Sequence, residues 1–393
     1  MSLTTPPLSL YVHVPWCVRK CPYCDFNSHE GRGELPLARY VDALIADLDH
    51  DLPLVWGRTV QTVFFGGGTP SLMPADLVDR FLQQASSRLR FAPGCEITLE
   101  ANPGTAEFGH LAGYRAAGVN RLSFGIQSFD DGCLARLGRI HDAAQAIDAV
   151  RQAQDTGFDN LNLDLMYALP GQDLAMALRD IEQAISLAPA HISHYQLTLE
   201  PNTVFASRPP KALPDDDLAW DMQEHCQARL AHAAYSHYET SAYARDGRYC
   251  AHNLNYWRFG DYLGIGAGAH GKVSLGAQQT LLRRWKHKHP TRYLDTAGTA
   301  AALGGDEMIE PARRPFEFML NALRLHEGYA WSMFEARTGL PRSAVAVPVS
   351  QAIARGWLID DGMRVMPTES GRRFTNDVLE LFLDTPVLAD IGG

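Results

Sequence analysis

Three closely spaced cysteines near the start of the chain constrain its fold and chemistry more than any other feature. They follow a short alternating segment with the spacing C-x3-C-x2-C, as Cys17, Cys21 and Cys24. Thiolates grouped in this way favour zinc or an iron–sulfur cluster, whereas a disulfide framework would need an even number. A structural zinc site has four ligands, and His13 or His29 could supply the fourth. A cubane cluster held by only three cysteines instead keeps one iron free to bind a ligand.

The composition is that of a globular protein large enough for more than one domain. The 393 residues are 46% apolar and 20% charged, and 45 acidic against 35 basic residues give a net charge of −10. This charge argues against nucleic acid or an anionic membrane as the main partner. No stretch reaches the roughly 18 apolar residues of a membrane span, and no signal peptide is visible. We therefore expect a cytoplasmic protein that reaches a membrane only through its partners.

Candidate strands and helices alternate along the first half of the chain. We expect strands at Leu8–Val14, Thr59–Phe65, Glu96–Glu100, Arg121–Ile126, Leu161–Met166 and His191–Leu199. Helical patterns fill the intervals, near 37–51, 74–90, 105–117, 141–156 and 173–187. Several of these strands are apolar on both faces, which is typical of a parallel sheet covered by helices. The alternation predicts an α/β fold, a full or partial (β/α) barrel, whose active site lies at the carboxyl ends of the strands.

The second half of the chain has a different pattern. We expect a helix at 216–234, a strand at His237–Tyr243, an irregular connection at 275–312, helices at Ala330–Thr338 and Arg342–Ala354, a hairpin at 356–365 and a last helix at Thr368–Leu383. Helices with one small hairpin suggest a winged-helix-like domain, and without a basic stripe a packing or lid module is favoured over DNA binding. The predicted regions are a barrel at 1–245, a connecting segment at 246–312 and a C-terminal, mostly helical domain at 313–393.

Polar or glycine-rich motifs follow the predicted strands at their carboxyl ends. Gly66–Pro70 lets backbone approach a ligand closely, although the same motif could be only a tight turn. Glu100 could accept hydrogen bonds from ribose hydroxyls or could cap a helix. Arg139 suits a bidentate grip on a carboxylate, and the charge of Asp164 among apolar residues is costly unless it is paired or bound to a ligand. These motifs would meet at one edge of the sheet.

Two further motifs lie outside these strands. His252–Trp257 reads HNLNYW, in which an imidazole suits haem iron and the aromatic rings suit a porphyrin face, or the motif is only a capped turn. Gly264–His270 reads GIGAGAH, and it either brings backbone close to a ligand or packs tightly.

Together these motifs resemble the radical S-adenosylmethionine (SAM) superfamily, and within it the HemW family of haem chaperones. HemW is related to HemN, the oxygen-independent coproporphyrinogen III oxidase. The resemblance runs from Leu8 to Leu383 and implies a [4Fe–4S] cluster on Cys17, Cys21 and Cys24, with SAM on the free iron. The SAM contacts that it implies are Tyr11, Gly67, Gly68, Thr69, Glu100, Gln127, Arg139, Asp164 and His270. The histidine that it associates with haem is His252.

Two departures distinguish the chain from HemN-type oxidases. The oxidases carry a further cysteine two residues after the third cluster ligand, where this chain has Phe26, and they have a longer arm before the first strand. Both departures favour a protein that binds haem and transfers it to acceptor haemoproteins, with respiratory enzymes among the candidates. The alternatives are a coproporphyrinogen decarboxylase or a radical SAM enzyme acting on another tetrapyrrole, so the sequence leaves open whether the protein is an enzyme.

Overall fold

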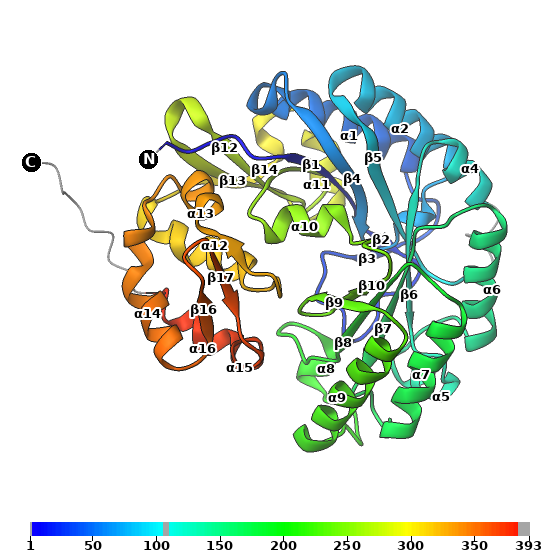
Figure 1. The fold of residues 1–393 in the computed structure, drawn as a ribbon. Coiled ribbons are helices and arrows are strands. Elements are labelled where there is room, and N and C mark those ends of the chain that lie inside the picture. The colour runs from blue at the N-terminus through cyan, green and yellow to red at the C-terminus, as the bar shows by residue number, and fades with distance from the viewer. Residues whose placement is uncertain (1, 105–109, 384–393) are drawn as a thin grey trace, which may run out of the picture.

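A curved sheet with helices on its outer face dominates the molecule in the computed structural model (Figure 1), which describes residues 2–104 and 110–383. Six parallel strands form its centre in the order β1-β4-β5-β6-β7-β8. Their bounds are Leu8–Val14, Thr59–Gly67, Arg90–Ala101, Arg121–Gln127, Leu161–Tyr167 and His191–Gln196. The sheet is open rather than closed, because different strands continue it at its two edges and the outermost strands, β14 and β9, do not pair with each other. The predicted partial (β/α) barrel is confirmed.

The helices that cover the outer face come from the intervals between strands. They are α1 (Leu37–Asp51), α2 (Ala75–Arg88), α4 (Leu111–Ala116), α6 (Ala143–Asp155), α7 (Leu174–Ser186) and α9 (Asp216–His232). The short helices α5 (Asp131–Arg136) and α8 (Val204–Ser207) belong instead to a small core beside Tyr23, in the segment that carries the three cysteines. Aspartate side chains cap the amino ends of α6, α7 and α9, from Asp142, Asp173 and Asp215. Such caps satisfy amide groups that the first helical turn leaves unpaired, and they fix where each helix begins. Part of the helix predicted at 105–117 lies outside the described residues.

Beyond the six central strands, one edge of the sheet carries β10 (Ala242–Ala244) and β9 (Ser236–Glu239). At the other edge β11 (Asp261–Ile265) runs parallel to β1, and antiparallel strands β12 (His270–Leu275), β13 (Thr280–Lys286) and β14 (Leu303–Ile309) follow it. The short strands β2 (Trp16–Cys17) and β3 (His29–Glu30) pair with each other, and helix α11 spans Pro290–Thr296. Helix α10 (Ala251–Trp257) contacts β1, β4 and β11.

The expectation of an irregular connection at 275–312 is wrong, because this stretch contains β13, α11 and β14. Its strands are half exposed, and their arginines pair with acidic side chains from elsewhere. Arg283 contacts Glu317, and Arg284 contacts Asp51. An arginine that pairs across elements hides the apolar alternation by which a strand is recognised in a sequence.

The C-terminal region packs helices against a small sheet (Figure 1, orange to red). It comprises α12 (Arg314–Ala322), β15 (Tyr329–Ala330), α13 (Trp331–Thr338), α14 (Ala346–Ala354), β16 (Leu358–Asp360), β17 (Arg364–Pro367), α15 (Glu369–Arg373) and α16 (Thr375–Glu380). The single helix predicted at 368–383 is divided at Phe374 into α15 and α16. Phe259, Leu281 and Ile309 belong to the core of this region, so the connecting segment packs on it as well as on the sheet. Within the described residues, no helix is both long and apolar enough to span a membrane.

Candidate functional site

The three predicted cluster cysteines lie in the loop that leaves the carboxyl end of β1. Cys17, Cys21 and Cys24 are half buried, unpaired in any disulfide, and line one cavity of about 140 Å³. Burial raises the pKa of the Cys17 thiol. The same cavity is lined by residues at or just beyond the carboxyl ends of β4, β5 and β6, together with Asp164 of β7 and Tyr195 of β8. Its location therefore agrees with the predicted edge of the sheet, and we call it the cluster cavity.

The glycine motif after β4 is held against the cysteine loop by backbone hydrogen bonds. Gly68 N–H donates to the Val14 carbonyl and Thr69 N–H to the Trp16 carbonyl, each at 2.7 Å. Gly67 has a φ of +117°, and a Cβ atom there would lie 2.5 Å from the His13 ring. A Cβ on Gly68 would lie 2.5 Å from the Trp16 carbonyl oxygen. Both positions require glycine, because a side chain would push the loop away from the cysteines.

Two carboxyl groups, Glu100 and Asp164, line the inner wall of the cluster cavity. Burial and the nearby Asp164 raise the pKa of Glu100 to about 8, although it accepts a hydrogen bond from Gly67 N–H at 3.2 Å. Burial also raises the pKa of Asp164, which accepts hydrogen bonds from Asn162 and Ser123. Neither carboxyl group forms an ion pair with another described residue, so the pair favours a ligand that carries positive charge or donates hydrogen bonds.

Gln127 and Arg139 complete the polar wall of the cluster cavity. Gln127 ends β6 with a φ of +72°, an uncommon conformation for a residue with a side chain, and its Oε1 accepts from Tyr195 Oη at 2.9 Å. Arg139 Nη2 donates to Asn102 Oδ1 at 2.6 Å and to the Gly125 carbonyl at 2.5 Å, while Nη1 contacts Cys21 Sγ at 3.5 Å. Arg139 Nε is buried and has no partner among the described residues. A carboxylate ligand would satisfy this nitrogen.

A second cavity of about 540 Å³ adjoins the cluster cavity and shares Phe26, Gly67 and Glu100 with it. We call it the aromatic cavity, because rings form much of its lining, from Tyr11, Phe26, Tyr256, Trp257, Phe259 and Tyr262. Lys272, Arg283 and Lys288 supply positive charge, but the first two are committed to other groups. Lys272 Nζ donates to Asp261, and Arg283 forms a two-fold contact with Glu317. Within the described residues, the exposed Lys288 ammonium has no carboxylate partner.

The predicted residues His270 and Tyr11 line the aromatic cavity rather than the cluster cavity. His270 is exposed, and its ring stacks on Trp285 with centroids 6.1 Å apart. Partial burial and the neighbouring Arg283 and Lys288 lower the pKa of His270, so its imidazole is neutral near pH 7. Neutral imidazole is the form that binds a metal.

His252, the residue that the resemblance associates with haem, lies beneath the aromatic cavity and is not among its lining residues. Only 1% of it is exposed. One ring nitrogen, Nδ1, contacts Thr62 Oγ1 at 2.7 Å, and Nε2 contacts Tyr256 Oη at 2.9 Å. Both nitrogens are thus engaged, and the ring orients Tyr256, which does line the cavity.

Sequence reasoning missed several residues of these cavities. Tyr195 lies within the strand predicted at His191–Leu199, but β8 ends at Gln196, so the sequence did not place Tyr195 near a strand end facing the cluster cavity. Asn27, Lys288 and Asn321 come from three distant segments and meet at the aromatic cavity. No spacing in the sequence indicates that they are neighbours.

Comparison with known proteins agrees with this geometry. The model of the radical SAM superfamily matches residues 11–184, and that of the HemN C-terminal domain matches residues 309–374. A relative named heme chaperone HemW in Escherichia coli is 49% identical over 378 residues, covering 96% of this chain and 98% of the relative. The chain belongs to the HemW family. The HemW of Haemophilus influenzae is also 49% identical, and the match covers 96% of this chain and 98% of the relative. The HemW of Mycobacterium tuberculosis is 34% identical, and the match covers 96% of this chain and 95% of the relative.

The fold of this HemW-family chain also matches a solved structure. The radical SAM enzyme coproporphyrinogen III oxidase (HemN) from Escherichia coli superposes with a TM-score of 0.81, covering 96% of this chain and 90% of that one. At 23% identity this match concerns the fold alone. It confirms the predicted radical SAM barrel with its C-terminal domain.

Family membership implies a [4Fe–4S] cluster and SAM, and the residues present fit both groups. No set of three or more His, Cys, Asp or Glu side chains within the described part of the chain is arranged to hold a single metal ion. A cubane cluster does not need such a set, because each of its cysteines binds a different iron. The unpaired Arg139 Nε and the two buried carboxyl groups beside the cysteines match the charges of SAM, which carries both a carboxylate and positive groups.

Proposed function

We propose that this protein is a haem chaperone that binds haem in the aromatic cavity and transfers it to acceptor haemoproteins, respiratory enzymes among them. In the adjoining cluster cavity it would hold a [4Fe–4S] cluster and SAM. The proposed role as a haem chaperone is supported by the relatives named heme chaperone HemW, which match this chain over nearly its full length. The observation that carries the proposal is the pairing of a cysteine-lined cavity with a larger aromatic one.

The aromatic cavity suits the chemistry of haem. A porphyrin is flat and apolar, and aromatic side chains cover such a surface well. Haem also carries two propionates at one edge, and the unpaired ammonium of Lys288 can bind one of them at the rim of the cavity. Phe26 lies on the boundary of the two cavities, where it separates the thiols from the porphyrin site without adding a polar group.

His270 is the axial ligand that we infer for haem iron, in place of His252. Its imidazole is exposed at the aromatic cavity and neutral near pH 7, whereas both nitrogens of His252 are engaged. His252 then acts as a positioning residue, because its Nε2 holds the Tyr256 hydroxyl. This reassigns His270 from SAM binding to haem binding.

For the cluster cavity we infer that Cys17, Cys21 and Cys24 would hold the [4Fe–4S] cluster and that SAM would bind beside it. A bound cluster would supply the electron for reductive cleavage of SAM. Arg139 would pair with the SAM carboxylate through its free Nε. Glu100 and Asp164 would accept hydrogen bonds from amino or hydroxyl groups, with Gln127 and the backbone of Gly67–Thr69 completing the wall.

The alternative function is coproporphyrinogen oxidation, which the similarity of fold to the HemN oxidase favours. The decisive experiment is anaerobic reconstitution of the cluster, followed by haem titration and by a coproporphyrinogen turnover assay with SAM and a reductant. We expect about one haem per chain and no turnover. Turnover of coproporphyrinogen by protein that binds no haem would contradict the chaperone proposal and support the oxidase.

A further inference from the structure

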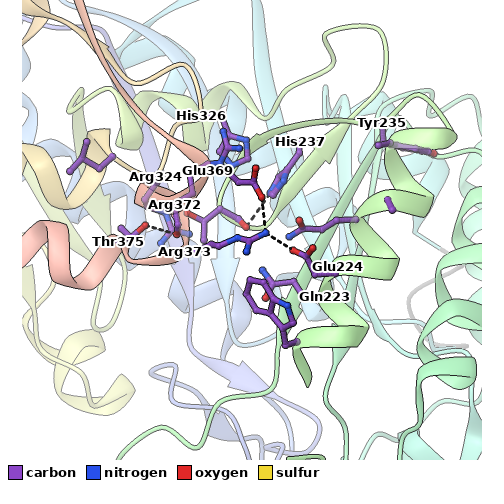
Figure 2. Close-up of a pocket in the computed structure, with 16 residues that line it drawn as sticks. Gln223, Glu224, Tyr235, His237, Arg324, His326, Glu369, Arg372, Arg373 and Thr375 are labelled. Carbon is purple, nitrogen blue, oxygen red and sulfur yellow. Dashed lines mark hydrogen bonds and ion pairs between the residues drawn. The ribbon is translucent and has the colours of Figure 1, made fainter. Parts of the chain in front are cut away.

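A third cavity, of about 450 Å³, lies between the barrel and the C-terminal region, away from the cysteines (Figure 2). Helix α9 and strand β9 form one side, and the segment 323–326 with helix α15 forms the other. The two sides also meet through an isolated bridge between Glu239 and Leu325 and through the hydrogen bond from His326 N–H to the Tyr238 carbonyl. The cavity thus lies where the last strand of the barrel sheet joins the C-terminal region.

One of the arginines around this cavity has no partner among the described residues. Of its three arginines, Arg373 contacts both Glu369, at 2.6 Å, and Glu224, at 3.2 Å, as Figure 2 shows. Arg324 contacts Glu239 at 3.4 Å. Within the described residues, the Arg372 guanidinium has no hydrogen bond or ion pair, although it lines the same cavity. Both lining carboxylates contact Arg373, so the Arg372 guanidinium keeps its donors free for a ligand.

Two histidines lie beside this free guanidinium. The rings of His237 and His326 meet edge to face with centroids 4.1 Å apart. Burial lowers the pKa of His237 to about 4 and that of His326 to about 3, and the charge of Arg372 acts in the same direction on both. The other charged groups that line the cavity are the paired Arg324, Arg373, Glu224 and Glu369. Both imidazoles are therefore neutral near pH 7, and His237 Nε2 contacts the Thr240 carbonyl oxygen at 3.2 Å.

We propose that this cavity is a binding site for an anionic ligand carrying a phosphate or carboxylate group, held by Arg372 with the His237–His326 pair. The guanidinium of Arg372 offers a planar set of donors, which matches both kinds of oxyanion. The charge that attracts the anion is that of Arg372, so binding should change little between about pH 6 and pH 8. The site would join the barrel to the C-terminal region through one ligand.

Aromatic rings connect this anion site to its surroundings. Arg373 lies over the Trp220 ring at 4.6 Å from the centroid. Arg324 lies over the Trp257 ring at 4.3 Å from the centroid, and Trp257 also lines the aromatic cavity. Movement of either arginine on anion binding would change the environment of an indole. Tryptophan fluorescence is therefore a direct reporter for the site.

The experiment titrates the full-length protein with sulfate, phosphate and succinate. Binding is measured by isothermal calorimetry and by the change in tryptophan fluorescence. Sulfate keeps its charge between about pH 6 and pH 8, so any pH dependence belongs to the protein. We expect one saturable site at millimolar anion or below, with nearly equal sulfate affinity at the two pH values. The phosphate and succinate arms show whether the preferred ligand is a tetrahedral oxyanion or a carboxylate.

The variant Arg372→Ala should weaken anion binding about tenfold or more, the effect of losing a charge-assisted hydrogen bond. Arg372→Lys should recover part of it, because the charge returns without the planar donors. The matched control is Arg151→Ala, which removes another exposed arginine, on α6. Arg372 is exposed, so folding should not depend on it, and circular dichroism checks this. Absence of saturable binding, or equal binding by wild type and Arg372→Ala, would overturn the proposal.

Discussion

The cluster cavity and the aromatic cavity share a wall but are built in different ways. The cluster cavity consists mainly of backbone, thiols and buried carboxyl groups at the ends of consecutive parallel strands. The aromatic cavity gathers side chains from β1, the loop after the cysteines, α10, the antiparallel strands β12 and β13, and α12. Parallel strands bring successive loops to one edge, so such a site recurs whenever the barrel forms. The aromatic cavity instead depends on how the connecting segment and the C-terminal region pack.

This difference explains what the sequence could predict. Cys17, Gly67, Glu100 and Arg139 follow strands whose apolar pattern is clear, and the structure brings them to one cavity. The antiparallel strand β13 was missed because paired arginines interrupt its pattern, and β14 because glycines and acidic residues interrupt its own. Without those strands the position of Lys288 relative to Trp257 could not be derived.

His252 shows a second limit of sequence reasoning. The motif HNLNYW was recognised, but residue types do not tell which member faces a cavity. In the structure Tyr256 and Trp257 line the aromatic cavity, while His252 is buried beneath it against Thr62. A helical turn places residues four apart on the same face, so the histidine supports the tyrosine rather than standing free beside it.

The variant that should separate the two cavities most completely is Cys21→Ala. Removing one of three cluster ligands should abolish the brown colour of anaerobically reconstituted protein and nearly all of its iron. Haem affinity should stay within about threefold of wild type, because Cys21 lies outside the aromatic cavity. Iron analysis and haem titration measure the two effects. Loss of haem binding by a folded Cys21→Ala protein would show that the cavities are not independent.

Glu100→Gln should lower SAM affinity and raise the stability of the ligand-free protein. The native pKa of Glu100, about 8, lies above the ordinary value of a glutamate, so the native state binds more protons than the unfolded state between these values. The carboxyl group therefore costs stability increasingly as pH rises through that window, and glutamine removes the cost.

The pH dependence of this variant provides the check. Wild-type SAM affinity should increase as pH rises towards about 8, because ionised Glu100 attracts a positive ligand. In Glu100→Gln that increase should be absent, and the melting temperature near pH 8 should be higher than that of wild type. A melting temperature below that of wild type would show that Glu100 is ionised and paired in the native state.

The smallest effect should come from Lys288→Ala at the rim of the aromatic cavity. An exposed ion pair contributes about 0.2–1 kcal/mol, so haem affinity should fall by a factor of about 1.4 to 5. The difference should shrink at high salt, because exposed charges are screened. Lys20→Ala is an unsuitable comparison, since Lys20 binds backbone carbonyls of the cysteine loop, so Lys211→Ala on an exposed turn is the control. An equal loss in both variants would exclude a propionate contact at Lys288.

Haem spectra of His270→Ala and His252→Ala, recorded under the same anaerobic conditions, test most directly the claim that haem occupies the aromatic cavity. We predict that His270→Ala shifts the Soret band, since it removes the inferred axial ligand from the cavity wall. His252→Ala should keep the band position and lose only affinity, because it frees Tyr256. Both variants should retain the iron–sulfur cluster. A shifted Soret band in His252→Ala with an unchanged band in His270→Ala would contradict the account.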